Sequence, residues 1–176
     1  MKRYKREDIL LVYSSRTGNT KKVAEAIAGA LGIPALPVEA QPSPAGRGLV
    51  IAGFWVDRGT ADAKMKAYLE HLQGTSVALF ATLGADPASD HAAACRERAT
   101  ALLGAGCTVE GTFLCQGKVS EQVVAQMKTM FPPGHPHALT PEWMTRLAQA
   151  SSHPDEEDLK RAQQYFLGFL AQDGAA

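Results

Sequence analysis

Hydroxyl side chains and a glycine are concentrated in one short segment near the start of the chain. The segment Ser15-Arg16-Thr17-Gly18-Asn19-Thr20 separates an apolar run from a pattern of helical spacing. At a helix start, free backbone N–H groups and the positive end of the helix dipole favour a bound anion. A glycine there lets the backbone come close to the anion. The segment therefore predicts a phosphate site made by Ser15, Arg16, Thr17, Gly18, Asn19 and Thr20.

The spacing in this loop excludes two common nucleotide motifs. No Gly-Lys-Ser/Thr follows it, so it is not a P-loop, and one glycine is too few for the dinucleotide pattern G-x-G-x-x-G. A second interpretation stays open, in which the Ser and Thr side chains only cap the helix that follows.

Other reactive side chains give weaker signals. His135 and His137 lie among prolines without further ligands nearby, so no metal site is predicted. His91 starts a helix and could donate a proton near neutral pH, with a solvated histidine as the alternative. Cys115 is interpreted as a small buried side chain rather than a thiolate. No catalytic residue is therefore assigned.

The composition of the chain limits its partners and its compartment. Among 176 residues, 18 are basic and 18 acidic, so no net charge favours nucleic acid or a membrane surface as a partner. Three cysteines without a C-x-x-C spacing fit neither a disulfide framework nor a zinc ribbon. No stretch reaches the roughly 20 apolar residues that span a bilayer. We therefore expect a cytoplasmic protein.

Five apolar runs alternate with segments of helical spacing, which predicts an α/β fold. The runs cover residues 9–13, 35–38, 49–54, 77–82 and 108–115. The helical segments cover residues 20–31, 61–73 and 89–103, followed by one that Ser120 caps, with Val123, Val124, Met127 and Met130 on one side. Strands alternating with such helices form right-handed βαβ units. We expect a doubly wound, five-stranded parallel sheet with helices on both faces.

The remainder of the chain is predicted to add helices to this sheet. After an irregular stretch at residues 133–137, one helix starts near Thr140 and another near Pro154. The second carries the apolar residues Leu159, Ala162, Phe166, Phe169 and Leu170 on one side. We expect one domain over residues 1–176, with a core of about 7–131 and a helical C-terminal extension of about 132–176 that packs on it.

The pattern S-x-T-G-x-T after the first strand resembles the FMN phosphate signature of the flavodoxin family. It is complete at Ser15, Thr17, Gly18 and Thr20. Segments 53–62, 83–85 and 113–118 also resemble a subgroup from anaerobic bacteria that includes the flavodoxin-like companion of bilirubin reductase. The resemblance implies FMN as the cofactor and the strand order 2-1-3-4-5, with the ligand at the switch point of the sheet.

This resemblance implies that the loops after the third and fourth strands flank the flavin ring. The first loop offers Phe54, Trp55, Val56, Arg58 and Gly59. Trp55 is expected to stack on the ring, and the Arg58-Gly59 peptide to face the reactive flavin nitrogen, although a helix-packed Trp and an ordinary turn glycine are the alternatives. The second loop offers Thr82, Leu83, Gly84, Ala85 and Asp86 for the pyrimidine edge. This second loop contains no aromatic residue. The ring is therefore expected either to be more exposed or to be covered by another segment, such as residues 115–118.

The expected function is electron transfer through FMN between a donor reductase and an acceptor enzyme. Typical flavodoxins are strongly acidic, whereas this chain is neutral. The neutrality leaves open a single dedicated partner, or an oxidoreductase that acts directly on a quinone, a porphyrinogen or another small substrate. A third alternative is a flavodoxin-like interaction domain without a cofactor.

Overall fold

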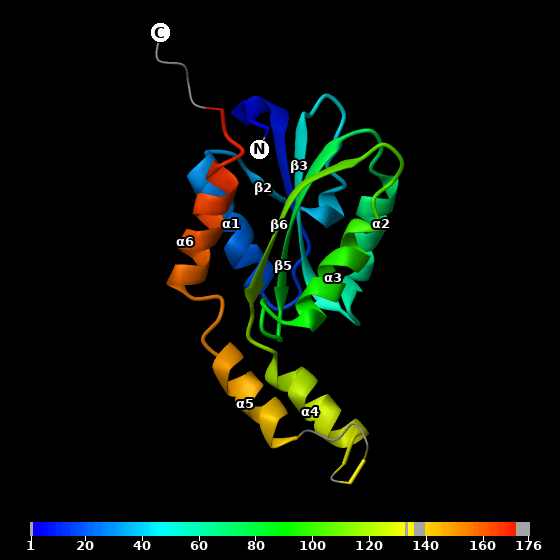
Figure 1. The fold of residues 1–176 in the computed structure, drawn as a ribbon, viewed down its shortest axis with the longest axis vertical. Coiled ribbons are helices and arrows are strands. Elements are labelled where there is room, and N and C mark those ends of the chain that lie inside the picture. The colour runs from blue at the N-terminus through cyan, green and yellow to red at the C-terminus, as the bar shows by residue number, and fades with distance from the viewer. Residues whose placement is uncertain (1, 133, 136–139, 172–176) are drawn as a thin grey trace.

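A computed structural model describes residues 2–132, 134, 135 and 140–171, and it has a parallel sheet at its centre (Figure 1). The five parallel strands are β1 (Ile9–Tyr13), β2 (Ala35–Pro37), β3 (Leu49–Asp57), β5 (Ser76–Leu83) and β6 (Thr108–Gln116). Their order is β2-β1-β3-β5-β6, and the short strand β4 (Thr60–Ala61) pairs with β3 antiparallel. With the parallel strands numbered alone, this is the order 2-1-3-4-5, so the predicted fold class is confirmed.

Helices cover both faces of the sheet (Figure 1). One face carries α1 (Asn19–Leu31) and α6 (Glu156–Leu167), and the other carries α2 (Ala63–His71) and α3 (Asp90–Thr100). Short 3-10 turns, η1 (Arg6–Asp8) and η2 (Val38–Ala40), lie before β1 and after β2. Each face has its own buried apolar cluster. A sheet buried on both sides explains why β1, β3 and β5 are continuous apolar runs rather than alternating ones.

The helix α6 and the turn directly after it contribute aromatic side chains to the core. Phe166 and Phe169 are fully buried. The Phe166 ring lies 5.9 Å from the ring of Phe80 on β5, in an edge-to-face arrangement, and 6.3 Å from that of Phe113 on β6. The N-terminal segment holds the end of this helix, because the Tyr4 N–H donates to the Phe169 carbonyl at 2.8 Å. The predicted packing of the last helix on the domain is thus confirmed.

Helices α4 (Glu121–Met130) and α5 (Pro141–Ala150) form a pair that projects from one end of the domain between β6 and α6 (Figure 1). No residue of α4 is buried, and Met130 is 66% exposed. α4 is therefore not part of the buried core of the sheet domain. Its apolar stripe has helical spacing, but the aromatic side chains of α6 already fill the place against β6.

Candidate functional site

The predicted phosphate loop lies at the carboxyl edge of the sheet. β1 ends at Tyr13 and α1 begins at Asn19, with Gly18 as its N-cap in the left-handed region at φ 97°. β1 pairs with β2 on one side and with β3 on the other, so the strand order reverses direction at this point. Ligands of open α/β sheets bind outside the carboxyl ends of the strands at such a switch point.

Hydrogen bonds hold the loop in place. The Ser15 hydroxyl oxygen accepts from the N–H groups of Gly18 and Lys21, each at 3.2 Å, so it is bonded to the first turn of α1, although the N-cap position itself is Gly18. The hydroxyls of Thr20 and Thr82 are bonded at 2.9 Å, and both side chains are buried. Thr17 and Gly18 remain exposed. The loop therefore combines a fixed helix start with exposed backbone and one exposed hydroxyl.

A cleft of about 140 Å³ opens beside this loop. Nine of the predicted site residues line it, namely Arg16, Thr17, Asn19, Thr20, Trp55, Val56, Thr82, Leu83 and Gly84. Seven others do not line it, namely Ser15, Gly18, Phe54, Arg58, Gly59, Ala85 and Asp86. The cleft also includes five residues that were not predicted as binding residues, namely Gly117, Lys118, Val119, Ser120 and Val123.

Trp55 and Phe54 point to opposite faces of the sheet because successive side chains of a strand alternate. Trp55 pairs in register with Thr82 of β5 and borders the cleft. The guanidinium of Arg16 lies over the Trp55 ring, 5.6 Å from its centre. Phe54 is 2% exposed and packs in the core under α2 and α3. The sequence analysis named both aromatic residues as binding residues and expected Trp55 to stack on the ring, and of the two only Trp55 borders the cleft.

The segment predicted as an open loop after the third strand is a β-hairpin. β3 continues to Asp57, and Arg58 and Gly59 form a two-residue turn with positive φ at both positions, 49° and 83°. Such a turn matches the twist of paired strands, which is why the chain returns at once as β4. The Gly59 carbonyl accepts a hydrogen bond from Arg98 Nη1 at 3.2 Å. The turn is thus tied to α3 and does not line the cleft.

Asp62 joins the start of the phosphate loop to the start of α2. Its Oδ1 accepts from the Ser14 hydroxyl at 2.7 Å and from the N–H groups of Lys64 and Met65 at 3.2 and 3.4 Å. The side chain is 2% exposed, and Oδ2 has no partner among the described residues. Burial raises the pKa of this carboxyl. The sequence analysis missed Asp62, although an Asp directly before a helical pattern is a typical cap signal.

The loop between β6 and α4 closes the other side of the cleft. The Gly117 N–H donates to the Leu83 carbonyl at 2.8 Å, and Asn19 Nδ2 donates to the Lys118 carbonyl at 2.9 Å. The Val119 side chain lies where a side chain on Gly84 would have to be. This loop therefore connects the phosphate loop with the segment after β5. It includes Gly117 and Lys118, which belong to the segment that was named as a possible cover of the flavin ring.

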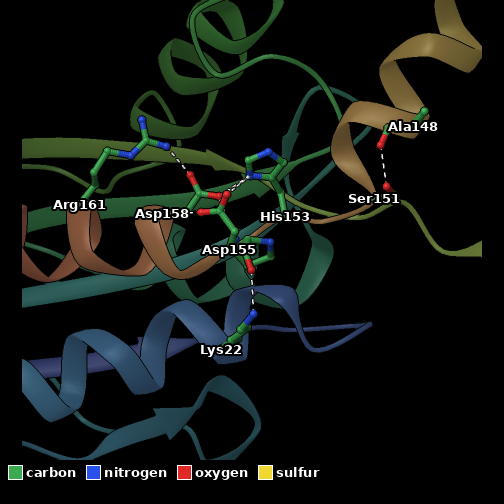
Figure 2. A network of polar contacts seen from close by, with 8 residues as sticks. Lys22, Ala148, Ser151, His153, Asp155, Asp158 and Arg161 are labelled. Atoms are coloured by element: carbon green, nitrogen blue, oxygen red, sulfur yellow. Dashed lines mark hydrogen bonds and ion pairs between the residues drawn. The ribbon is translucent and has the colours of Figure 1, made fainter.

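Figure 2 shows a polar network around His153, Asp158 and Arg161 at the start of α6, with Lys22 of α1 beside it. The Lys118 N–H donates to the His153 carbonyl at 2.8 Å, and Lys22 Nζ donates to the Pro154 carbonyl at 2.7 Å. The Nδ1 of His153 lies 2.5 Å from Asp158 Oδ2. Arg161 forms an ion pair with the other oxygen of Asp158. The network thus links three segments of the chain behind the cleft.

Within the network, Asp155 and Asp158 form a capping box at the start of α6. Each side chain accepts from the backbone N–H of the other, at 2.9 and 3.1 Å. Burial alone would raise the pKa of Asp158, which is 1% exposed, but its hydrogen bonds, chiefly with His153, outweigh burial and lower the pKa. One imidazole and two carboxylate oxygens lie within 4.8 Å of one another here, but helix capping and the Arg161 ion pair account for the arrangement.

The other reactive side chains lie away from the cleft. His91 is exposed, and its Nε2 lies 3.5 Å from the Cys95 sulfur. Cys115 is fully buried, and burial raises its pKa to about 12, which agrees with its interpretation as a buried small side chain. His135 does not line the cleft, and His137 lies outside the described residues. Among the described helices, none is long and apolar enough to cross a membrane.

Comparisons with known proteins agree with this geometry. A family described as "Flavodoxin domain" matches residues 10–167. The "Flavodoxin-like domain-containing protein BilS" of Clostridioides difficile is 29% identical over 163 residues, which cover 89% of this chain and 92% of that protein. The protein of the same name from Clostridium symbiosum is 29% identical over 189 residues, which cover 93% and 96%.

Solved structures show the same fold at lower identity. The crystal structure of oxidised Flavodoxin 2 from Bacillus cereus has a TM-score of 0.51 at 19% identity and covers 92% of this chain and 97% of that chain. Oxidised Flavodoxin 1 from Bacillus cereus has a TM-score of 0.50 at 16% identity and covers 93% and 99%.

Proposed function

The chain belongs to the flavodoxin domain family, and on this premise we propose that it binds FMN in the cleft and carries electrons between a donor reductase and an acceptor enzyme. The observation that supports FMN most directly is the position of Ser15-Arg16-Thr17-Gly18-Asn19-Thr20. This loop opens α1 at the switch point of the sheet and borders a cleft with an aromatic side chain. A phosphate at the helix start and a ring beside Trp55 would use both features.

The residues of the cleft fit FMN by their chemistry. Arg16 offers a cation and Thr17 an exposed hydroxyl. Gly18 lies between Thr17 and Asn19 of the cleft, and no atom is within 4 Å of the position of a Cβ there, so its backbone is open to an anion. Val56, Leu83 and Val119 add apolar surface beside Trp55. A site with few polar groups for the anion and apolar walls for the ring is typical of cofactor pockets.

The protein supplies binding and orientation, whereas the redox chemistry belongs to the cofactor. FMN, when bound, supplies one-electron and two-electron transfer. The phosphate loop would hold the anion with amides, hydroxyls and the guanidinium. The apolar side chains would exclude water from part of the ring and so influence its potentials.

The composition of the cleft favours a carrier over an enzyme that reduces a small substrate. The side chains that line the cleft among the described residues include no imidazole, carboxyl, phenol or thiol. Direct reduction of a quinone would need a group that delivers protons near neutral pH. His91, the residue considered for this task, does not line the cleft.

The experiment that tests the proposal starts with FMN added to the purified protein and removal of the excess. We expect the visible flavin bands to stay with the protein at micromolar concentration. Reduction under anaerobic conditions, followed by addition of a quinone, then separates the two redox functions, because a carrier without a partner should show no rapid turnover. Loss of the flavin bands during removal would instead favour a cofactor-free interaction domain.

The phosphate loop provides a sharper test of FMN binding. Thr17→Ala together with Thr20→Ala should weaken FMN binding by more than about tenfold. The exposed Thr17 hydroxyl loses a bond to a charged group, which contributes roughly 1.5–3 kcal/mol, and Thr20→Ala removes the buried bond to Thr82 that holds the start of α1. Thr145→Ala is the control, since that exposed hydroxyl donates to the Pro141 carbonyl of its own helix at 3.1 Å and does not line the cleft. Titration of flavin fluorescence gives the dissociation constants. Equal affinity of the double variant and the control would remove the phosphate-loop assignment.

A further inference from the structure

Arg16 and Trp55 make a contact that the phosphate loop does not need for its own conformation. Arg16 lies in the loop and is exposed, and Trp55 stands on β3. The guanidinium is 5.6 Å from the ring centre, within the distance at which a cation is attracted to an aromatic face. Both residues line the cleft, so the contact between the guanidinium and the Trp55 ring lies at the border of the cleft, beside the phosphate loop.

One face of an aromatic ring holds one stacked group at a time. A flavin ring that stacks on this face of Trp55 must therefore displace the Arg16 guanidinium. The displaced cation loses its contact with the ring, unless another group receives it. A phosphate at the start of α1 is such a group, because Arg16 belongs to the same loop and a guanidinium pairs well with phosphate oxygens.

We propose that Arg16 selects for the phosphorylated flavin. Its guanidinium occupies the face of Trp55 on which the flavin ring would stack, and it leaves this face only when a phosphate is present to pair with it. This inference rests on the proposed function, since it concerns how the same cleft discriminates among flavins. When FMN binds, Arg16 loses its contact with the Trp55 ring and gains a stronger one with the phosphate. Riboflavin has the same ring without the phosphate, so it must displace Arg16 without compensation.

The small size of the cleft supports this competition. Its volume of about 140 Å³ is below the roughly 300–1,000 Å³ of pockets that take cofactor-sized molecules. The Arg16 side chain occupies space directly over Trp55, and Val119 occupies space over Gly84. On the Arg16 side, movement of one exposed side chain enlarges the cleft without any change in the core.

The test compares the affinities of FMN and riboflavin for the wild type and for Arg16→Ala, Arg16→Lys and Lys21→Ala. Lys21→Ala is the matched control, because it removes a nearby cation that pairs with Glu25 at 3.7 Å and does not line the cleft. The wild type should prefer FMN. Arg16→Ala should bind riboflavin at least about threefold more tightly than the wild type, as expected when a cation–π contact no longer competes. Its preference for FMN should fall by more than about tenfold, because a bond to phosphate is also lost.

The other two variants separate charge from stacking. Arg16→Lys keeps a cation for the phosphate but stacks less well, so FMN affinity should stay close to that of the wild type while riboflavin binds more tightly. Lys21→Ala should leave riboflavin affinity unchanged. The contact itself has a separate readout in the Trp143→Phe background, where Trp55 is the remaining one of two tryptophans. There, Arg16→Ala should change the tryptophan emission of the protein without flavin.

The outcomes are distinguishable. If the wild type binds FMN but Arg16→Ala binds riboflavin no more tightly than the wild type does, Arg16 does not compete with the ring and the inference is wrong. Unchanged tryptophan emission would also overturn it. If the wild type binds neither flavin, the proposed function fails as well, and the wild-type titration alone shows this.

Discussion

Two buried carboxylates support the site from opposite sides and in opposite electrostatic settings. Asp62 bonds Ser14 at the entry to the phosphate loop, and it has one oxygen without a partner among the described residues. Asp158 lies in the network behind the loop that follows β6, between His153 and Arg161. The pKa of Asp62 is raised by burial, whereas that of Asp158 is lowered by its partners. Their contributions to stability should therefore respond to pH in opposite directions.

For Asp62, the raised pKa means that the folded protein binds a proton more tightly than the unfolded chain. The free energy of unfolding should then decrease as pH rises from the unfolded pKa through the folded one. Asp62→Asn keeps a capping oxygen and removes the charge, so its stability relative to the wild type should increase from acid to neutral pH. Asp62→Ala should lose about 0.5–2 kcal/mol with the cap. Urea unfolding at several pH values measures both, and equal losses in the two variants at neutral pH would contradict the prediction.

For Asp158, the lowered pKa gives the opposite sign. Its contribution to stability should be fully present above the unfolded pKa of about 3.9 and disappear as pH falls through the folded pKa. Asp158→Asn should therefore be less stable than the wild type at neutral pH, by about 1–3 kcal/mol if one charged hydrogen bond is lost. The difference should shrink when unfolding is measured below the unfolded pKa. A difference that stays constant down to that range would show that the loss is steric.

At the scale of elements, α6 and α4 have similar apolar patterns but different surroundings. Both have apolar residues at helical spacing, but Phe166 of α6 is fully buried and Met130 of α4 is 66% exposed. Phe166→Ala should reduce the free energy of unfolding by about 3–5 kcal/mol because it leaves a cavity under the sheet. Met130→Ala, the matched truncation, should change it by about 0.5 kcal/mol or less. Denaturant unfolding of both variants measures the two changes. Similar losses in the free energy of unfolding would mean that α4 packs on the core.

The order of elements followed from the sequence because continuous apolar runs such as residues 49–54 have few alternatives to a buried parallel strand. The phosphate loop followed for the same reason, since its position between a strand and a helix fixes its environment. The element that packs against each amphipathic helix could not be predicted, because periodicity shows that a helix has an apolar side but not what covers that side. The hairpin at Arg58 and Gly59 was also missed, since Arg is rare at positive φ.

The sequence analysis named Gly117 and Lys118 only in a segment that could cover the ring, and it did not name Val119, Ser120 and Val123 as cleft residues. They come from the loop after β6 and the start of α4, and their place depends on contacts between distant segments. The Asn19 bond to Lys118 joins positions 99 residues apart. Such a contact leaves no local pattern in a single sequence, whereas the phosphate loop carries its whole signal in six adjacent residues.

At the scale of the whole molecule, the helix pair α4 and α5 is an insertion into the sheet domain. The chain leaves the domain near Lys118 and returns at His153, where the Lys118 N–H meets the His153 carbonyl at 2.8 Å. Between these points, Ala150 is the one buried residue of the two helices. The pair therefore contributes little buried area to the sheet, although Ser120 and Val123 at its base border the cleft.

This arrangement predicts that the sheet domain folds without the pair. Replacement of residues 121–149 by a short Gly-Ser linker should be possible because the chain on either side of the segment already meets, at Lys118 and His153. Since Ala150 and Ser120 are kept, the free energy of unfolding should fall by less than about 2 kcal/mol, less than the loss expected for Phe166→Ala. Denaturant unfolding followed by tryptophan fluorescence from Trp55, with Trp143→Phe in the full chain as the control, measures the change. A shortened chain that no longer unfolds cooperatively would make the pair part of the core. A folded one with unchanged FMN affinity would show that the cofactor site depends on the sheet, the phosphate loop and the loop after β6 alone.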